Sequence, residues 1–262
     1  MKKLLSIVLI LVLSLSCFSL ASCDKEEFTK EQLEAYENYT NALKKTNELD
    51  DLDGKLDMII SMNVQGTQQT VSYNFNMKAS GATDPKAVKM RLGGKMNLSG
   101  QNTVMDCYME NSWAYYDMNV SGQKVKFKTN LADGGNSYSE LFNAGNVDLP
   151  KSLFKKVAVT EQSDGSKLLE LTLSGKQLLS LYTDLAANLG TDFSASDISD
   201  ASVNATVNKD GYLSKTTVSY TMMIQGISAK LTLTVEYFNL GKSVTVEPIE
   251  GYQSFPEQII GG

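Results

Sequence analysis

The sequence contains no histidine and few cysteines, and these two absences exclude much of ordinary enzyme chemistry. Without histidine the chain cannot build a Ser-His-Asp or Cys-His catalytic group, a histidine metal site or the usual proton shuttle near neutral pH. The three cysteines are Cys17, Cys23 and Cys107. Because the first two lie in the N-terminal segment discussed below, Cys107 remains as a single thiol, and no disulfide framework is expected within one chain.

Other signatures of chemistry are missing as well. Neither G-x-G-x-x-G nor G-x-x-x-x-G-K-[ST] occurs, so nucleotide binding has no support. The net charge of −6 argues against nucleic acid, which needs clustered Lys and Arg. Two carboxyl groups alone could form a glycosidase pair, but Asp106 and Glu110 stand at the polar positions of an alternating segment, as solvated acids do. We expect no enzyme activity, no cofactor and no metal.

The N-terminus has the composition of a secretory signal peptide. Lys2 and Lys3 precede an apolar run over residues 4–12, which is shorter than the about 20 residues of a membrane-spanning helix. The letters LAS then precede Cys23, an order that resembles the bacterial lipobox. This resemblance implies that residues 1–22 are removed and that Cys23 carries a diacylglyceryl anchor in the membrane, on its extracytoplasmic face. Cys17 fits less well, and an ordinary secreted protein is the alternative.

The remaining 240 residues are long enough to bury a core without covalent staples. Removal of residues 1–22 takes away two lysines and no acid, so the net charge becomes −8. Such a surface does not suit a polybasic membrane patch, and the lipid would do the anchoring.

Residues 23–54 are predicted to form a lipid-anchored helix or tether. Thr29 is a suitable N-cap, with Gln32 three residues later as in a capping box. The segment ends in DDLDG, where Gly54 is the expected stop signal. The aspartates do not match a calcium-loop pattern, so we expect ordinary turn chemistry from them.

From residue 56 onwards the hydrophobic period changes to two. Apolar and polar residues alternate over residues 56–64, 71–78, 88–98, 105–109, 116–120, 125–131, 157–160, 168–173, 203–207, 218–224, 227–237 and 244–246. Turns such as QG, LSGQN and VSGQ separate these runs. Alternation with glycine turns is typical of antiparallel hairpins. Helical spacing interrupts the pattern at 137–145 and at 175–190, and residues 192–202 are expected to form a loop.

The fold class expected is α+β, mainly antiparallel β, with about 10–12 strands in one large curved sheet. The strand-rich segments 55–131 and 157–247 suggest a weak internal duplication. No linker rich in Pro, Gly and Ser separates them, so we expect a single domain over residues 55–262 with two helical insertions.

Several segments together carry a family resemblance. The lipobox, the acidic segment ALKKTNELDDLDGKLDM, the strand VKMRLGGKMNL and the closing NKDGYLSKTTVSYTMMIQG resemble lipoproteins of the LolA/LolB/LppX-like superfamily. They are most similar to a Met-rich group from Gram-positive bacteria. The resemblance implies a half-barrel whose concave face is covered by helices. In related carriers the space between sheet and helices holds a lipid or a lipidated protein.

The number and position of the methionines are the remaining feature of the sequence that bears on function. Apart from Met1 there are ten, and nine stand at apolar positions of their segments. Methionine fills irregular or changing apolar spaces, which suits a cavity for an acyl chain and equally a plain core. Thioethers also bind Cu(I), but Met58/Met62 and Met105/Met109 would lie about 13 Å apart along their strands. That distance is too long for one ion without partners from other strands.

The hypothesis is therefore a membrane-anchored, non-enzymatic lipoprotein that binds a lipid or acyl chain in an apolar cavity. The alternative is an envelope protein with a solid core that binds another protein through its polar strand faces or sheet edge. The residues expected to line or cover the cavity are Met58, Met62, Phe75, Met77, Met90, Met96, Met105, Met109, Leu178, Leu181, Leu185, Tyr220, Met222, Leu231 and Leu233.

Overall fold

The structure is a computed structural model, and it describes residues 28–64, 66–84, 87–98, 100–131, 150–188, 195–224 and 226–258. Cys23, the expected signal peptide and the expected helix at 137–145 lie outside these residues. The side chains of Leu181 and Leu185 also lie outside the description.

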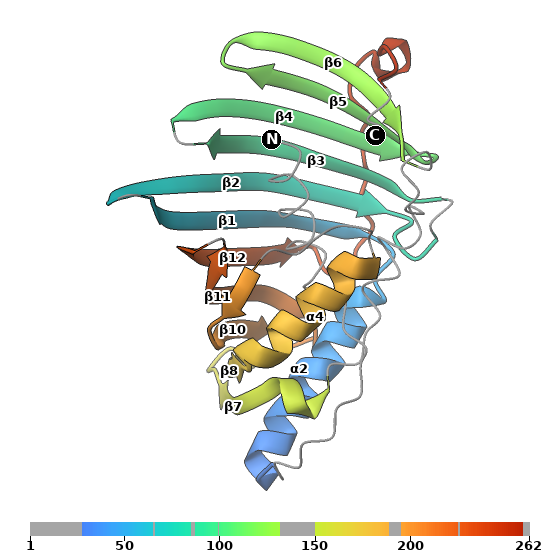
Figure 1. Ribbon diagram of the computed structural model, residues 1–262. Helices are drawn as coiled ribbons and strands as arrows, with labels where there is room; N and C mark the ends of the chain where they lie inside the picture. Colours follow the sequence, from blue (N-terminus) through green and yellow to red (C-terminus); the bar gives the residue numbers. More distant parts are fainter. Residues whose placement is uncertain are drawn as a thin grey trace. The chain divides into compact units, whose positions relative to one another are not determined.

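The described residues form two α-helices and twelve strands (Figure 1). The helices are α2 (Lys30–Asn47) and α4 (Gly175–Asn188), and short 3-10 helices occur at η2 (Lys151–Leu153) and η3 (Tyr252–Ser254). The strands are β1 (Leu52–Val64), β2 (Thr67–Ser80), β3 (Lys89–Leu98), β4 (Gln101–Glu110), β5 (Trp113–Val120), β6 (Gln123–Asn130), β7 (Phe154–Glu161), β8 (Lys167–Leu173), β9 (Ala195–Ile198), β10 (Ala201–Val207), β11 (Leu213–Ile224) and β12 (Ile227–Phe238).

The strands belong to one sheet in the order β6-β5-β4-β3-β2-β1-β12-β11-β10-β8-β7, and β9 pairs with β11 off this path. The registers of β2 through β6 are antiparallel. The same holds for β7, β8, β10 and β11. The expected fold class, mainly antiparallel β in one large sheet of 10–12 strands, is confirmed.

The chain divides into two compact units. Unit 1 comprises Met1–Asn47, Ser61–Gln68 and Asn143–Thr232, and unit 2 comprises Glu48–Ile60, Gln69–Phe142 and Leu233–Gly262. Each unit is described below by itself. The assignment of residues 55–262 to a single domain stays a prediction.

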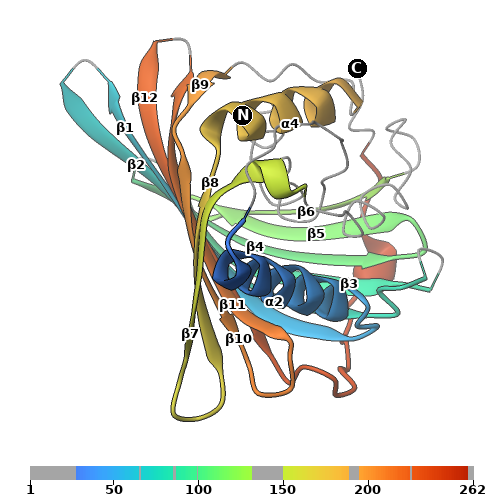
Figure 2. The ribbon, with the colours of Figure 1, turned by 90° about the horizontal axis from the view of Figure 1, so that it is seen from below.

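In unit 1 both helices lie on the same side of strands β7, β8, β10 and β11 (Figure 2). Helix α2 begins with the expected capping box, in which the Gln32 N–H donates to Thr29 Oγ1 at 3.3 Å and the Thr29 N–H donates to Gln32 Oε1 at 2.9 Å. At its other end the buried Thr46 Oγ1 accepts the Leu213 N–H at 2.9 Å. These contacts fix both ends of the helix.

Two expectations about local structure were wrong. Gly54 does not end a helix, because α2 ends at Asn47 and Gly54 lies inside β1. A Cβ at Gly54 would lie 2.9 Å from the Glu236 carbonyl oxygen, so close backbone approach requires glycine there. The expected loop at 192–202 contains β9 and the start of β10. Ala195, Asp197 and Ile198 of β9 pair with β11, with an irregular register at Ser196.

In unit 2 the aspartates of DDLDG serve turn chemistry, as expected. Asp50 Oδ1 accepts the Thr83 hydroxyl at 2.5 Å, and Asp51 Oδ2 accepts the Val244 N–H at 3.2 Å. Asp53 Oδ2 accepts the side-chain amide of Asn239 at 3.1 Å. The acidic segment therefore ties the start of β1 to neighbouring loops.

Candidate functional site

Unit 2 carries a group of methionines on one face of its sheet. The register places Met90 directly opposite Met109, and Met105 directly opposite Met118. Met77 shares this face, because its partner Leu92 is two residues from Met90. We name the five residues Met77, Met90, Met105, Met109 and Met118 the methionine face. Met118 was not among the expected cavity residues, although its apolar position in the sequence offered the signal.

The methionine face is only half buried. All five of its side chains are partly exposed. In the row that contains Met105 and Met118, Phe75 on β2 is 5% exposed whereas Val125 on β6 is 39% exposed. Neighbouring apolar side chains of this face are thus partly accessible to solvent, whereas Cys107 and Ala114 on the same face are buried.

In unit 1, by contrast, apolar residues of β8 and β10 on the sheet face beneath α2 are buried. Val203, Ala205 and Val207 of β10 are buried, as are their neighbours Leu169 and Leu171 of β8. Helix α2 buries Ala35, Tyr39 and Ala42. The Tyr36 and Phe154 rings meet edge to face with centroids 5.2 Å apart. Among the described residues of unit 1, these side chains bury one another beneath α2.

The expected cavity residues fall into two classes. Met62, Met77, Met90, Met105 and Met109 are partly exposed. The others whose side chains are described are buried: Met58, Phe75, Met96, Leu178, Tyr220, Met222, Leu231 and Leu233. Met62, Leu178, Tyr220, Met222 and Leu231 belong to unit 1, and the rest belong to unit 2. That these residues line one cavity stays a prediction.

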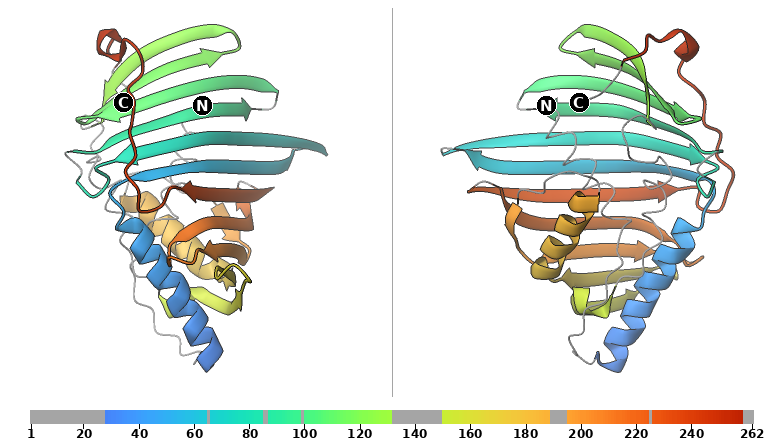
Figure 3. Two further views of the ribbon diagram at one scale, coloured as in Figure 1. Left: turned by 180° about the vertical axis from the view of Figure 1, so that it is seen from behind. Right: turned by 45° about the vertical axis from the view of Figure 1, so that its right-hand side comes forward.

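The opposite face of the unit 2 sheet is crossed by the C-terminal segment, residues 239–258, which we name the strap (Figure 3). Tyr108 of β4 is 1% exposed beneath it, packed with Val246, Ile249 and Phe255. The Tyr115 and Tyr252 rings meet edge to face with centroids 4.7 Å apart. The cluster was not expected from the sequence, although Tyr108 and Tyr115 are aromatic residues at polar positions of their strands.

The strap also pairs with the edge of the sheet. The Lys128 N–H donates to the Pro256 carbonyl and the Gln258 N–H donates to the Lys128 carbonyl, both at 2.8 Å. Exposed edge strands invite pairing with other chains, so this contact protects part of β6. Three lysines of β6, Lys124, Lys126 and Lys128, protect the edge further, because charged side chains oppose such pairing.

A hollow of about 480 Å³ lies on this same polar face beside the strap. Its floor is Gly93, and Lys78, Lys95 and Glu247 are among its walls. Arg91 there binds both carboxylate oxygens of Asp106 at 3.0 and 2.7 Å and donates to the Glu247 carbonyl at 3.0 Å. A second hollow, of about 200 Å³, lies on the polar face of unit 1 beside Lys156, Glu170 and Asn204. Both hollows are open, and Val104 and Met105 line the first one together with its charged side chains.

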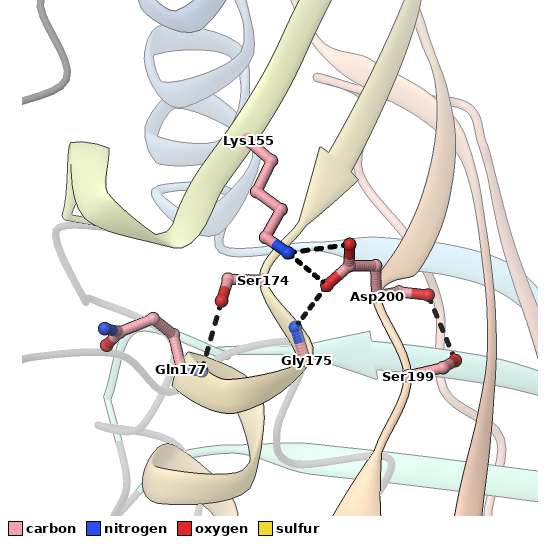
Figure 4. Close-up of polar contacts among 6 residues, drawn as sticks. All are labelled: Lys155, Ser174, Gly175, Gln177, Ser199 and Asp200. Carbon is pink, nitrogen blue, oxygen red and sulfur yellow. Dashed lines mark hydrogen bonds and ion pairs between the residues drawn. The ribbon is translucent and has the colours of Figure 1, made fainter.

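Asp200 organises the start of α4 in unit 1 (Figure 4). Its carboxylate accepts Lys155 Nζ at 2.9 and 2.8 Å and the Gly175 N–H at 3.0 Å. These hydrogen bonds, that of Lys155 first, hold the pKa of Asp200 below its ordinary value. A Cβ at Gly175 would lie 2.0 Å from the Ile198 carbonyl oxygen, so the helix can begin this close to β9 only with glycine. The arrangement is a helix cap.

The thiol of Cys107 is buried, and the carboxylate of Glu110 takes part in structural hydrogen bonds. Cys107 is 3% exposed, and burial raises the pKa of its thiol to about 12. Glu110 accepts Lys89 Nζ at 2.9 Å and the Tyr252 hydroxyl at 3.2 Å. Within the described ranges no group of three or more His, Cys, Asp or Glu residues could hold a metal ion. Neither described helix is long and apolar enough to cross a membrane.

Comparison with known proteins defines the family. Residues 34–246 match a family model described as "Family of unknown function (DUF6612)", and the chain belongs to this family. No curated protein matches the chain at a significant level.

Solved structures with some similarity include two from bacteria. LprF from Mycobacterium bovis has 10% sequence identity and a TM-score of 0.49, and the match covers 84% of this chain and 99% of LprF. The LolA superfamily protein NE2245 from Nitrosomonas europaea has 10% identity and a TM-score of 0.25, with 81% of this chain and 96% of that chain covered. Structural neighbours thus include a LolA-superfamily protein, and membership of the Met-rich Gram-positive group stays a prediction.

Proposed function

We propose that the chain is a membrane-anchored, non-enzymatic lipoprotein that binds an apolar ligand, a lipid or an acyl chain. The observation that carries this proposal is the half-exposed methionine face of unit 2. Met105 and Met118, paired directly across β4 and β5, both remain partly exposed, and Val125 beside them is 39% exposed. A contiguous apolar surface of this kind is a feature of ligand or partner sites.

The chemistry of methionine suits an acyl ligand. An acyl chain is flexible, and its burial is favourable by about 0.8 kcal/mol for each CH₂ group removed from water. Unbranched, polarisable thioether side chains adapt to such a chain better than branched ones do. Gly94, directly opposite Phe75 and Met105, leaves room for the Phe75 ring within the same row. The face therefore offers a broad apolar contact without a fixed shape.

The anchor of the proposal is Cys23. The lipobox-like letters LAS before it support lipidation at this residue and a position at the extracytoplasmic face of the membrane. An anchored binding protein of this kind would keep its apolar face within reach of the bilayer, from which an acyl ligand could come. The anchor is tested separately from the ligand, as described in the Discussion.

The alternative function is that of an envelope protein that binds another protein and holds no ligand. The buried face of unit 1 favours it, since Val203, Ala205 and Leu169 are each at most 1% exposed. The alternative predicts that the methionine face contributes to stability and not to uptake of small apolar molecules.

The test is a titration with a fluorescent fatty acid on the chain from residue 24 onwards, which retains every described residue. Met105→Gln and Met118→Gln should each weaken binding at least tenfold, because the amide places unpaired polar atoms against the ligand. Val104→Gln is the matched control: Val104 is adjacent in sequence and 47% exposed, but lies on the opposite face. Equal effects of the three substitutions, or no binding by the unchanged protein, would overturn the proposal.

A further inference from the structure

The described methionines fall into a buried group and a partly exposed group, and Met62 and Met223 also belong to the partly exposed group. Met58, Met96 and Met222 are 0%, 8% and 3% exposed. The five residues of the methionine face are all partly exposed, and four of them form the cross-strand pairs Met90–Met109 and Met105–Met118. Since oxidants attack thioether sulfur from solvent, reactivity should follow this division.

We infer that the methionine face is an oxidation site, at which a peroxide converts the half-exposed thioethers to sulfoxides and thereby abolishes binding of an apolar chain. In the reaction a sulfur lone pair attacks one oxygen of hydrogen peroxide, the S–O bond forms and the O–O bond breaks. The departing hydroxide is protonated by the hydrogen of the transferred oxygen, giving water. The sulfur loses two electrons and the peroxide is reduced by two. The loss of binding rests on the proposed function, whereas the selectivity of oxidation does not.

Competition from cysteine is weak in the described part of the chain. Cys107 lies on the same face of β4, between Met105 and Met109. It is 3% exposed, and burial raises the pKa of its thiol, so little of the reactive thiolate exists near neutral pH. Peroxide that reaches this face therefore meets thioethers before it meets a reactive thiol.

The consequence for binding follows from the pairing. A sulfoxide is polar and chiral, in contrast to the flexible apolar thioether that it replaces. Because Met105 and Met118 are direct partners, oxidation of either one places an S=O group in the middle of the apolar row that contains Phe75 and Val125. An acyl chain on that row would have to desolvate the new polar group without a hydrogen-bond partner. Oxidation of a few of these methionines would therefore be enough to abolish binding of an acyl chain to the methionine face.

The experiment treats the folded chain from residue 24 onwards with graded hydrogen peroxide and follows each methionine by peptide mass spectrometry. The five residues of the methionine face should oxidise at least tenfold faster than Met58, Met96 and Met222. Circular dichroism monitors the fold at each step. Equal rates for the two groups in folded protein would overturn the inference.

Binding of the fluorescent fatty acid is measured on the same samples. Affinity should fall at least tenfold as the face is oxidised. A variant in which all five residues of the face become Leu keeps its affinity after peroxide, because leucine preserves apolar volume and has no sulfur. Met58→Leu/Met96→Leu/Met222→Leu is the control and should lose affinity as the unchanged chain does. If the variant with five leucines does not fold, Met105→Leu/Met118→Leu should lose less affinity after peroxide than the unchanged chain does, because only Met77, Met90 and Met109 of the face can still be oxidised.

The outcomes separate the two proposals. Unchanged affinity after selective oxidation would overturn the inference and leave the proposed function intact. No binding by the untreated chain would overturn the proposed function and, with it, the claimed effect on binding. In that case the oxidation rates alone decide whether the methionine face is an oxidation site.

Discussion

Gly94 lies directly opposite Phe75 in the β2–β3 pair, and no larger residue fits at this position. A Cβ at Gly94 would lie 2.0 Å from the Asn74 carbonyl oxygen and 2.6 Å from the Phe75 ring. The preceding residue has more space, because a Cβ at Gly93 would lie 3.5 Å from Asp106 Oδ1, which is an ordinary van der Waals contact. The two neighbouring glycines therefore serve different purposes.

Gly94→Ala should lower the free energy of unfolding by about 2–4 kcal/mol, because the added methyl group collides with backbone atoms that can move only with their strand. Gly93→Ala should change the free energy of unfolding by less than about 1 kcal/mol, because the added methyl group would lie in the open hollow beside Asp106. Urea unfolding of both variants followed by circular dichroism measures the difference. Equal destabilisation would show that the close approach of Gly94 to Phe75 is not a constraint.

The carboxylate of Asp200 makes stability depend on acid. Its pKa is held below the ordinary value by Lys155 and the Gly175 N–H, so the folded chain binds this proton less readily than the unfolded chain. The stabilisation is present in full above the ordinary pKa near 3.8 and is lost as pH falls through the lower, folded-state pKa. Asp200 has a side chain that is 44% exposed, so salt will weaken the effect.

Asp200→Asn should therefore lower the melting temperature at pH 7 and flatten its decline below about pH 4. Asp197→Asn is the control, because Asp197 is an exposed residue of the neighbouring strand β9. Thermal unfolding from pH 2 to pH 7 provides the measurement. A variant whose acid decline parallels that of the unchanged chain would refute the role of Asp200.

Lipidation at Cys23 is testable in cells. Growth with labelled palmitate should label the protein, and Cys23→Ala should remove the label because the diacylglyceryl group has no thiol to join. Cys17→Ala should keep it, since Ser14 stands where a lipobox has leucine. Persistent labelling of the Cys23→Ala chain would contradict the proposed anchor.

Much of the fold was predictable because local rules determine it. Alternating residues and glycine turns give the strands and their antiparallel order, and the capping box at Thr29 marks the start of α2. Gly54 was misassigned because a glycine that ends a helix and one that permits close strand contact look alike in sequence. Strand β9 was missed because Ser196 and Asp197 have no apolar alternation of their own.

The candidate site was predictable only in part. The pattern placed Met105 and Met109 on one face, but their partners across the sheet, Met118 and Met90, follow from the register. Burial of Tyr108 under the strap depends on contacts with residues more than a hundred positions away, such as Val246. Half-exposure of a face is likewise a property of the folded chain, because it depends on which distant segments cover it.

The most direct test of the account is native mass spectrometry with lipid extraction on the chain from residue 24 onwards, purified from a bacterial host. The account predicts one co-purifying acyl species for each protein molecule, released by organic solvent and lost in Met105→Gln. A protein of unliganded mass that also fails to bind any member of a panel of fatty acids and phospholipids would contradict it.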